Sequence, residues 1–63
     1  MVQEGDLIRC ERTGTKYTCT GTDGSGRIRA EGPEGEAVQI DMDDLFFEDD
    51  NEYLATRVKR CTN

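Results

Sequence analysis

Hydrophobic and polar residues alternate with a period of two along most of the chain, a pattern that predicts β-strands. This alternation runs through residues 6–12, 15–20, 27–31, 37–41 and 53–60. Short stretches rich in glycine and small polar residues separate several of these segments and are typical of turns. Five short strands at this spacing, in a chain of 63 residues, predict a compact all-β barrel or curled sheet.

The first two segments are expected to pair as a hairpin. A tight turn at residues 13–14 would use a glycine, which readily takes the positive φ that such turns need. This turn places Cys10 opposite Tyr17 and Ile8 opposite Cys19. All four side chains should then point into the core.

The third and fourth segments are expected to form a second hairpin that turns at the sequence GPEGE. Centring this turn on Glu34 pairs Ala30 with Val38 and Ile28 with Ile40. The apolar faces of the two strands then match without a slip in register.

The segment YLATRVKR is expected to be the fifth and last strand. Leu54, Thr56 and Val58 occupy alternate positions, and residues such as Arg57 and Lys59 lie on the opposite face. We therefore expect the first set to face the core and the two bases to face solvent.

Between the second hairpin and this last strand, the sequence DMDDLF predicts a short helical turn. Asp43 and Asp44 suit its first turn, where carboxylates accept backbone amides and complement the helix dipole. Leu45, with either Phe46 or Phe47, should plug the open end of a barrel. The other phenylalanine should be partly exposed, because both cannot point inward from one helical turn.

This arrangement resembles the SH3-like small β-barrel of the Tudor and KOW type. The resemblance covers residues 4–60 and lies in EGDLIRCERTGTKYTCTG as an opening hairpin, GRIRAEGPEGEAVQI as a second hairpin and DMDDLF as the turn before the last strand. It implies a single domain, a five-stranded barrel with a frayed tail at residues 61–63. Such barrels bind proteins, nucleic acids or methylated side chains, so the resemblance implies a binding module without naming its ligand.

The charge of the chain is concentrated in one third of its length. Residues 1–30 carry five bases and four acids, residues 31–52 carry ten acids and no base, and residues 53–63 carry three bases and no acid. The sum, +1 − 10 + 3, gives the net charge of −6. No apolar run approaches the roughly 18 residues of a membrane span, and no signal peptide is evident. We therefore expect a cytoplasmic protein.

Several kinds of chemistry lack the residues they need, so we expect no enzyme, no metal and no cofactor. The chain has no histidine, hence no ordinary general base and no typical zinc ligand set. A calcium loop starting at Asp41 would place Leu45 and Phe46 where an oxygen ligand and a glycine are required. Cys10, Cys19 and Cys61 are expected to be free thiols, those in the strands buried, with a Cys10–Cys19 disulfide as the alternative.

Two candidate binding surfaces remain. The first is an acidic and aromatic surface that would bind a basic or apolar protein partner, or imitate the charge of nucleic acid. Its residues are Asp43, Asp44, Phe46, Phe47, Glu48, Asp49 and Asp50. The second would bind the phosphates of nucleic acid. Its residues are Arg27, Arg29, Arg57, Lys59 and Arg60. Alternatively, the acidic segment serves only the fold, and the bases pair with the surplus carboxylates.

Overall fold

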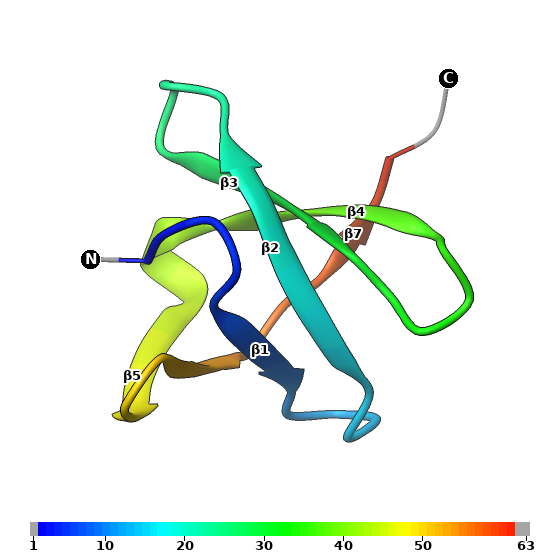
Figure 1. The fold of residues 1–63 in the computed structure, drawn as a ribbon, viewed down its shortest axis with the longest axis vertical. Coiled ribbons are helices and arrows are strands. Elements are labelled where there is room, and N and C mark those ends of the chain that lie inside the picture. Colours follow the sequence, from blue (N-terminus) through cyan, green and yellow to red (C-terminus); the bar gives the residue numbers. More distant parts are fainter. Residues whose placement is uncertain (1, 62–63) are drawn as a thin grey trace.

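The computed structural model describes residues 2–61, which form one strongly curled β-sheet (Figure 1). Its strands are β1 (Leu7–Cys10), β2 (Lys16–Thr22), β3 (Arg27–Glu31), β4 (Ala37–Asp41), β5 (Leu45–Asp49), β6 (Glu52–Ala55) and β7 (Lys59–Arg60). A turn of 3₁₀ helix, η1 (Met42–Asp44), lies between β4 and β5. The sheet order is β5-β6-β1-β2-β3-β4-β7, in which β1 and β6 are parallel and the other neighbours antiparallel. The predicted all-β class is confirmed.

The predicted closed barrel of five strands is wrong, because within residues 2–61 the sheet has seven strands and is open between β5 and β7. One extra strand is β5, in the segment where the sequence predicted a helical wedge. The other arises because the predicted last strand is interrupted at residues 56–58, so that β6 pairs with β1 and β7 pairs with β4. The helical turn η1 exists, but it precedes three strands rather than one.

The β1–β2 hairpin keeps its predicted faces but not its predicted register. Ile8 lies opposite Tyr17, so the predicted pairings of Cys10 with Tyr17 and of Ile8 with Cys19 are both wrong. A longer loop causes the difference: the Cys10 amide donates to the carbonyl of Thr15 at 2.8 Å, and Gly14 takes a φ of 73° inside the loop. A shift of two residues leaves the same side chains pointing inward, because side chains alternate with a period of two.

The β3–β4 hairpin has the predicted register. Ile28 lies opposite Ile40, and Ala30 lies opposite Val38. Gly35 supplies the positive φ of the turn, at 81°. All four paired side chains are buried, so matching of the apolar faces accounts for the register.

The core lies between the two halves of the curled sheet, where β2 crosses over β4 in Figure 1. A β-bulge between Cys19 and Gly21 interrupts the β2–β3 ladder, and such bulges increase local twist and bend a strand. The buried cluster consists of apolar side chains from most of the sheet. Its members are Val2, Ile8, Cys19, Ile28, Ala30, Val38, Ile40, Tyr53 and Ala55.

The predicted phase of the last strand is wrong for residues 53–55. Tyr53 and Ala55 face the core there and Leu54 does not, whereas Val58 packs against the core as predicted. Val2 also joins the core, although the predicted barrel began at residue 4. The tail prediction is tested only at Cys61, whose amide donates to the carbonyl of Ala37, since residues 62 and 63 lie outside the described part. No helix in residues 2–61 is long and apolar enough to cross a membrane.

Candidate protein-interaction edge

Strand β5 forms one edge of the sheet and carries both phenylalanines. Among the described residues it pairs with β6 alone, with Phe46 opposite Leu54 and Phe47 opposite Tyr53. Successive residues of a strand project to opposite faces, so Phe46 and Phe47 point away from each other. Both rings are consequently exposed, Phe46 at 55% and Phe47 at 65%.

The predicted plug of the barrel is therefore formed by Leu45 without either phenylalanine. Leu45 is half-buried and packs against the core cluster. Phe47 contacts the buried Tyr53 edge-on, with ring centroids 5.5 Å apart and planes inclined at 71°. This contact fixes the orientation of Phe47 relative to the sheet while most of its ring remains in solvent.

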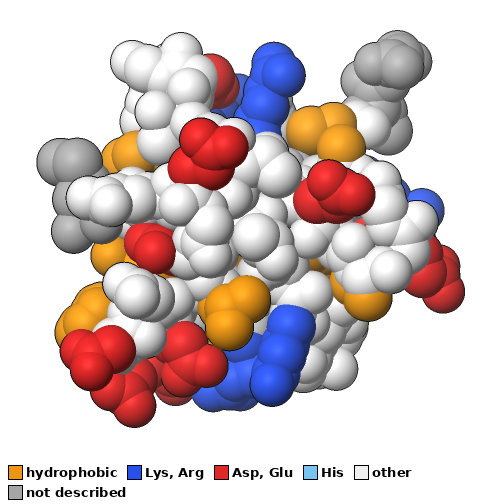
Figure 2. All heavy atoms as spheres, viewed as in Figure 1, with side chains coloured by type: hydrophobic (Ala, Val, Ile, Leu, Met, Phe, Trp, Pro, Cys, Tyr) orange, Lys and Arg blue, Asp and Glu red, His pale blue; other side chains and the backbone are white. Residues whose placement is uncertain are grey.

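Carboxylates lie at both ends of β5. Asp43 and Asp44 precede the strand in the first turn of η1, whose N-cap residue Asp41 makes no side-chain capping hydrogen bond, and Glu48, Asp49 and Asp50 follow the phenylalanines. Figure 2 shows acidic side chains gathered beside hydrophobic ones at the lower left, where β5 lies in Figure 1. We call this set the β5 edge surface. Its residues are Asp43, Asp44, Phe46, Phe47, Glu48, Asp49 and Asp50.

Two residues that the sequence did not single out belong beside this surface. Nη2 of Arg9 donates to both carboxylate oxygens of Glu48, each at 3.0 Å, which links β5 to β1 across β6. Leu7 is exposed, and its amide donates to the carbonyl of Asn51 in the β5–β6 turn at 2.9 Å. Both residues occupy outward-facing positions of the first alternating segment, and this is the sequence signal that could have identified them.

The turn between β5 and β6 depends on Asn51, which takes a φ of 59°. This left-handed conformation is uncommon for residues with a side chain, and asparagine tolerates it better than most. The turn is further held by the Asp50 amide, which donates to Oδ1 of Asp49 at 2.7 Å. The carboxylates at this end of β5 are thus placed by a tight hairpin.

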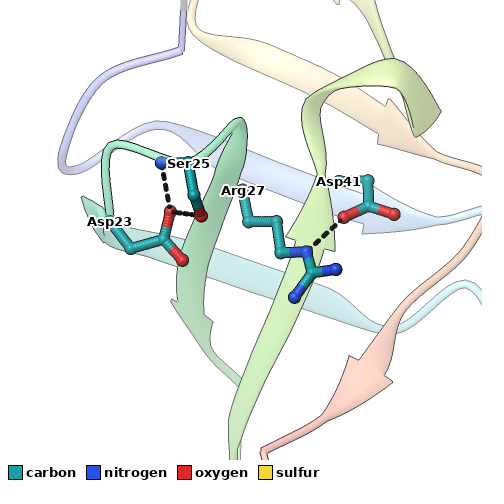
Figure 3. A network of polar contacts seen from close by, with 4 residues as sticks. All are labelled: Asp23, Ser25, Arg27 and Asp41. Atoms are coloured by element: carbon teal, nitrogen blue, oxygen red, sulfur yellow. Dashed lines mark hydrogen bonds and ion pairs between the residues drawn. The ribbon is translucent and has the colours of Figure 1, made fainter.

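The residues of the predicted nucleic-acid surface differ in their ion pairing. Arg27 is engaged with Asp41 on β4, with Nε 3.0 Å from Oδ1 (Figure 3). In the same figure, the amide and hydroxyl of Ser25 donate to Asp23, which closes the preceding loop and lowers the pKa of that carboxyl. Arg27 is therefore partly neutralised.

The remaining predicted bases fall into two groups that share Lys59. The registers of β3, β4 and β7 put Arg29, Gln39 and Lys59 in one row, and paired residues project to the same face. Lys59 also lines a hollow with Arg57 and Arg60. Lys59 belongs to both groups, and among the described residues Arg27 is the one of the five bases that has a carboxylate within 4.0 Å.

The prediction of buried thiols is confirmed for Cys10 and Cys19, and Cys61 is exposed. Burial raises the pKa of the Cys19 thiol, which has little to offset it. Burial also raises the pKa of Cys10, but hydrogen bonds from Thr13 and Arg12, with the charge of Arg12, outweigh it and lower the pKa overall.

The alternative disulfide between Cys10 and Cys19 does not form. The Cys10 amide donates to Thr15, and the Cys19 amide donates to Asp6. The two cysteines are therefore offset by four positions along the hairpin, roughly 13 Å at the rise of a β-strand. A disulfide needs a much shorter Cα separation.

Residues 2–61 contain no group of three potential ligands that would hold a metal ion. No protein-family model, no curated protein and no solved structure matches the chain. The geometry of the β5 edge surface is therefore the basis for a functional proposal.

Proposed function

We propose that this protein is a non-enzymatic interaction module that binds a protein partner through the β5 edge surface. The observation that supports this proposal is the exposure of aromatic rings on both faces of an edge strand, between two groups of carboxylates. The partner would have a basic or apolar surface. The proposal places the protein in the cytoplasm, in keeping with its free thiols.

An edge strand suits an extended partner segment. Its outer backbone amides and carbonyls are available to a further strand, and peptide recognition often uses this mode of pairing. Phe46 would contact side chains on one face of such a segment and Phe47 side chains on the other, since the two rings project to opposite faces. Exposed aromatic residues are frequent anchors of binding energy in interfaces.

The carboxylates would supply attraction at longer range. With ten acids in residues 31–52, this part of the chain produces a negative field that speeds association with a basic partner. In one version of the proposal, the spaced carboxylates imitate phosphates and the protein inhibits a nucleic-acid-binding partner by occupying its basic groove. Binding should then weaken as salt concentration rises.

The alternative function is nucleic-acid binding by a KOW-like domain through its arginine residues. The row that contains Arg29 and Lys59 supports this alternative. The engagement of Arg27 by Asp41 and the net charge of −6 favour the protein partner instead.

The two functions are tested by recovery of partners on the tagged full-length chain at low and high salt, with and without nuclease. A protein partner should survive nuclease and should be lost from a variant in which Asp43, Asp44, Asp49 and Asp50 are changed to Asn. The matched control changes the same number of acids, Glu4, Glu11, Glu31 and Glu34, to Gln, because all four are exposed and lie outside the β5 edge surface.

Phe46→Ser provides a second variant that removes an anchor without changing charge. Replacing Arg27, Arg29 and Arg57 by Ala should leave the protein partner bound. If recovery depends on these arginines and on intact nucleic acid, the alternative function is correct. If the acidic and Phe46 variants recover the partner as well as the control does, the β5 edge surface is not the binding site.

A further inference from the structure

A basic hollow lies away from the β5 edge surface, between the β1–β2 loop and the segment that joins β6 to β7. Its volume is about 470 Å³. The residues that line it come from β1, β2, β4 and the C-terminal part of the chain, and none lies in residues 41–52. They are Cys10, Arg12, Thr13, Tyr17, Glu36, Val38, Thr56, Arg57, Val58, Lys59 and Arg60.

The lining of the hollow has an excess of positive charge. It contains four bases and one acid, Glu36, which gives a local balance of +4 − 1 = +3. The β4–β7 pairing of Val38 with Arg60 brings the C-terminal bases to the same hollow as Arg12. Within residues 2–61, none of the four bases has a carboxylate within 4.0 Å.

This charge balance is unusual for the molecule as a whole, whose net charge is −6. Arg9 and Arg27, by contrast, each have an acidic partner at 3.0 Å. Four cations gathered without such partners repel one another, and an anion bound among them would relieve that repulsion. Arginine is also well suited to phosphate, which it can bind through two parallel hydrogen bonds.

The rest of the lining is partly apolar. Tyr17 and Val58 are half-buried, Val38 is buried, and the Cys10 thiol adds a further weakly polar surface. A hollow of about 470 Å³ lies in the range of small-molecule sites and exceeds what a bare phosphate ion would fill. An organic group attached to the phosphate would contact these apolar side chains.

We propose that the basic hollow binds a small phosphomonoester, such as a sugar phosphate or a mononucleotide, with the phosphate held by Arg12 and Arg57 and the organic part against Tyr17 and Val58. A small ligand senses mainly the local charge of the hollow, since charges more than about 8 Å away are screened at physiological salt. A long polyanion would also meet the acidic remainder of the surface, which opposes its binding.

The proposal is tested on the ¹⁵N-labelled full-length chain by titration with ribose 5-phosphate and with adenosine 5′-monophosphate. Saturable shifts of amide signals should concentrate at Arg12, Thr13, Arg57 and Val58. Inorganic phosphate should bind more weakly, and ribose and adenosine should cause no saturable shift. The double variant Arg12→Gln, Arg57→Gln should raise the Kd about a hundredfold, because each of the two lost charge-assisted hydrogen bonds is worth about a factor of ten.

Arg29→Gln is the matched control, because Arg29 is an exposed base outside the hollow. It should bind the phosphomonoesters as the wild type does. Absence of saturable shifts, shifts that map elsewhere, or equal weakening by the control would overturn the proposal. Equal affinity for inorganic phosphate would overturn the assignment of an organic ligand, and tighter binding of a single-stranded oligonucleotide to these amides would replace it with nucleic acid.

Cys10 provides a second readout from inside the hollow. In a Cys61→Ser background, ribose 5-phosphate should slow alkylation of Cys10 by iodoacetamide, because the bound anion covers the thiol and disfavours its thiolate. Cys19 is the internal control, since it is buried and does not line the hollow. Protection of Cys10 to the same extent by ribose alone, or no protection by the phosphomonoester, would contradict the proposed site.

Discussion

Replacing Phe46 by Ala should change binding much more than stability. The ring is already 55% exposed, so the substitution removes less than half of the burial energy of a phenylalanine. Full burial of such a side chain contributes about 3 kcal/mol at most, which gives a loss of about 1 kcal/mol for Phe46→Ala. A chain of this size has a total stability of roughly 3–9 kcal/mol, so the variant should remain folded.

Ile28→Ala provides the contrast, because Ile28 is fully buried between strands of the core. Removing a buried isoleucine costs about 3 kcal/mol, since it loses the transfer energy and leaves a cavity. Ile28→Val, which should cost about 1 kcal/mol, keeps the comparison measurable if the Ala variant unfolds.

Urea unfolding followed by far-ultraviolet circular dichroism measures all three variants. The free energy of unfolding should fall little for Phe46→Ala and strongly for Ile28→Ala. If Phe46→Ala destabilises the chain as much as Ile28→Ala does, the ring belongs to the core in solution. Phe46 would then not belong to an exposed β5 edge surface.

Three further predictions concern single contacts. Arg9→Gln should lower the free energy of unfolding by less than about 1 kcal/mol, because the Arg9–Glu48 pair is exposed. The difference from the wild type should disappear at about 1 M salt in the same urea assay. A difference that persists in salt would contradict this prediction. Gly14→Ala should lower the free energy of unfolding by about 1 kcal/mol because φ is 73° there, and no change in the melting temperature would mean that the loop adapts. Since burial raises the pKa of Cys19, its stabilising contribution is present below the unfolded pKa of about 8.5 and is lost as pH rises through the folded value. Wild type should therefore lose more stability than Cys19→Ala between about pH 8 and about pH 10 in urea titrations, and parallel curves would exclude this linkage.

The sequence predicted the β3–β4 hairpin correctly because its turn and its apolar alternation agree. Ile28 and Ala30 on one strand, and Val38 and Ile40 on the other, leave one register that buries all four side chains. The β1–β2 hairpin had the same apolar alternation but an ambiguous turn. Its faces were predicted correctly and its register was not, because a shift of two residues does not change which face is buried.

The sequence could not predict β5 or the division of the last strand. LFFED shows no alternation, because an edge strand without a covering layer does not have to bury one face. In the last strand, the small Ala55 faces the core and the larger Leu54 does not, contrary to what size and hydrophobicity suggest. Parallel pairing of β6 with β1 decides this phase, and such a long-range contact leaves no local signal.

The sequence predicted the residues of the β5 edge surface but not those of the basic hollow, because the latter are brought together by long-range pairing. The acidic and aromatic residues are neighbours in sequence, so locating one of them locates the others. The basic hollow combines Arg12 with Arg57, Lys59 and Arg60, which lie more than forty positions apart and meet only because β7 pairs with β4. Charge composition alone gave no reason to join Arg12 to the C-terminal bases.

The carboxylates at the β5 edge oppose the self-association that the exposed phenylalanines would otherwise favour. An edge strand with exposed aromatic rings is a template for pairing with a second copy of itself. In such a pair, the acids at the two ends of one β5 would face the acids of the other, and like charges brought together oppose the contact. A basic partner meets no such repulsion and gains attraction from the same carboxylates. The charges that disfavour self-association are thus the ones that would favour a basic protein at this edge, which is why we propose a role for the acidic segment in recognition as well as in the fold.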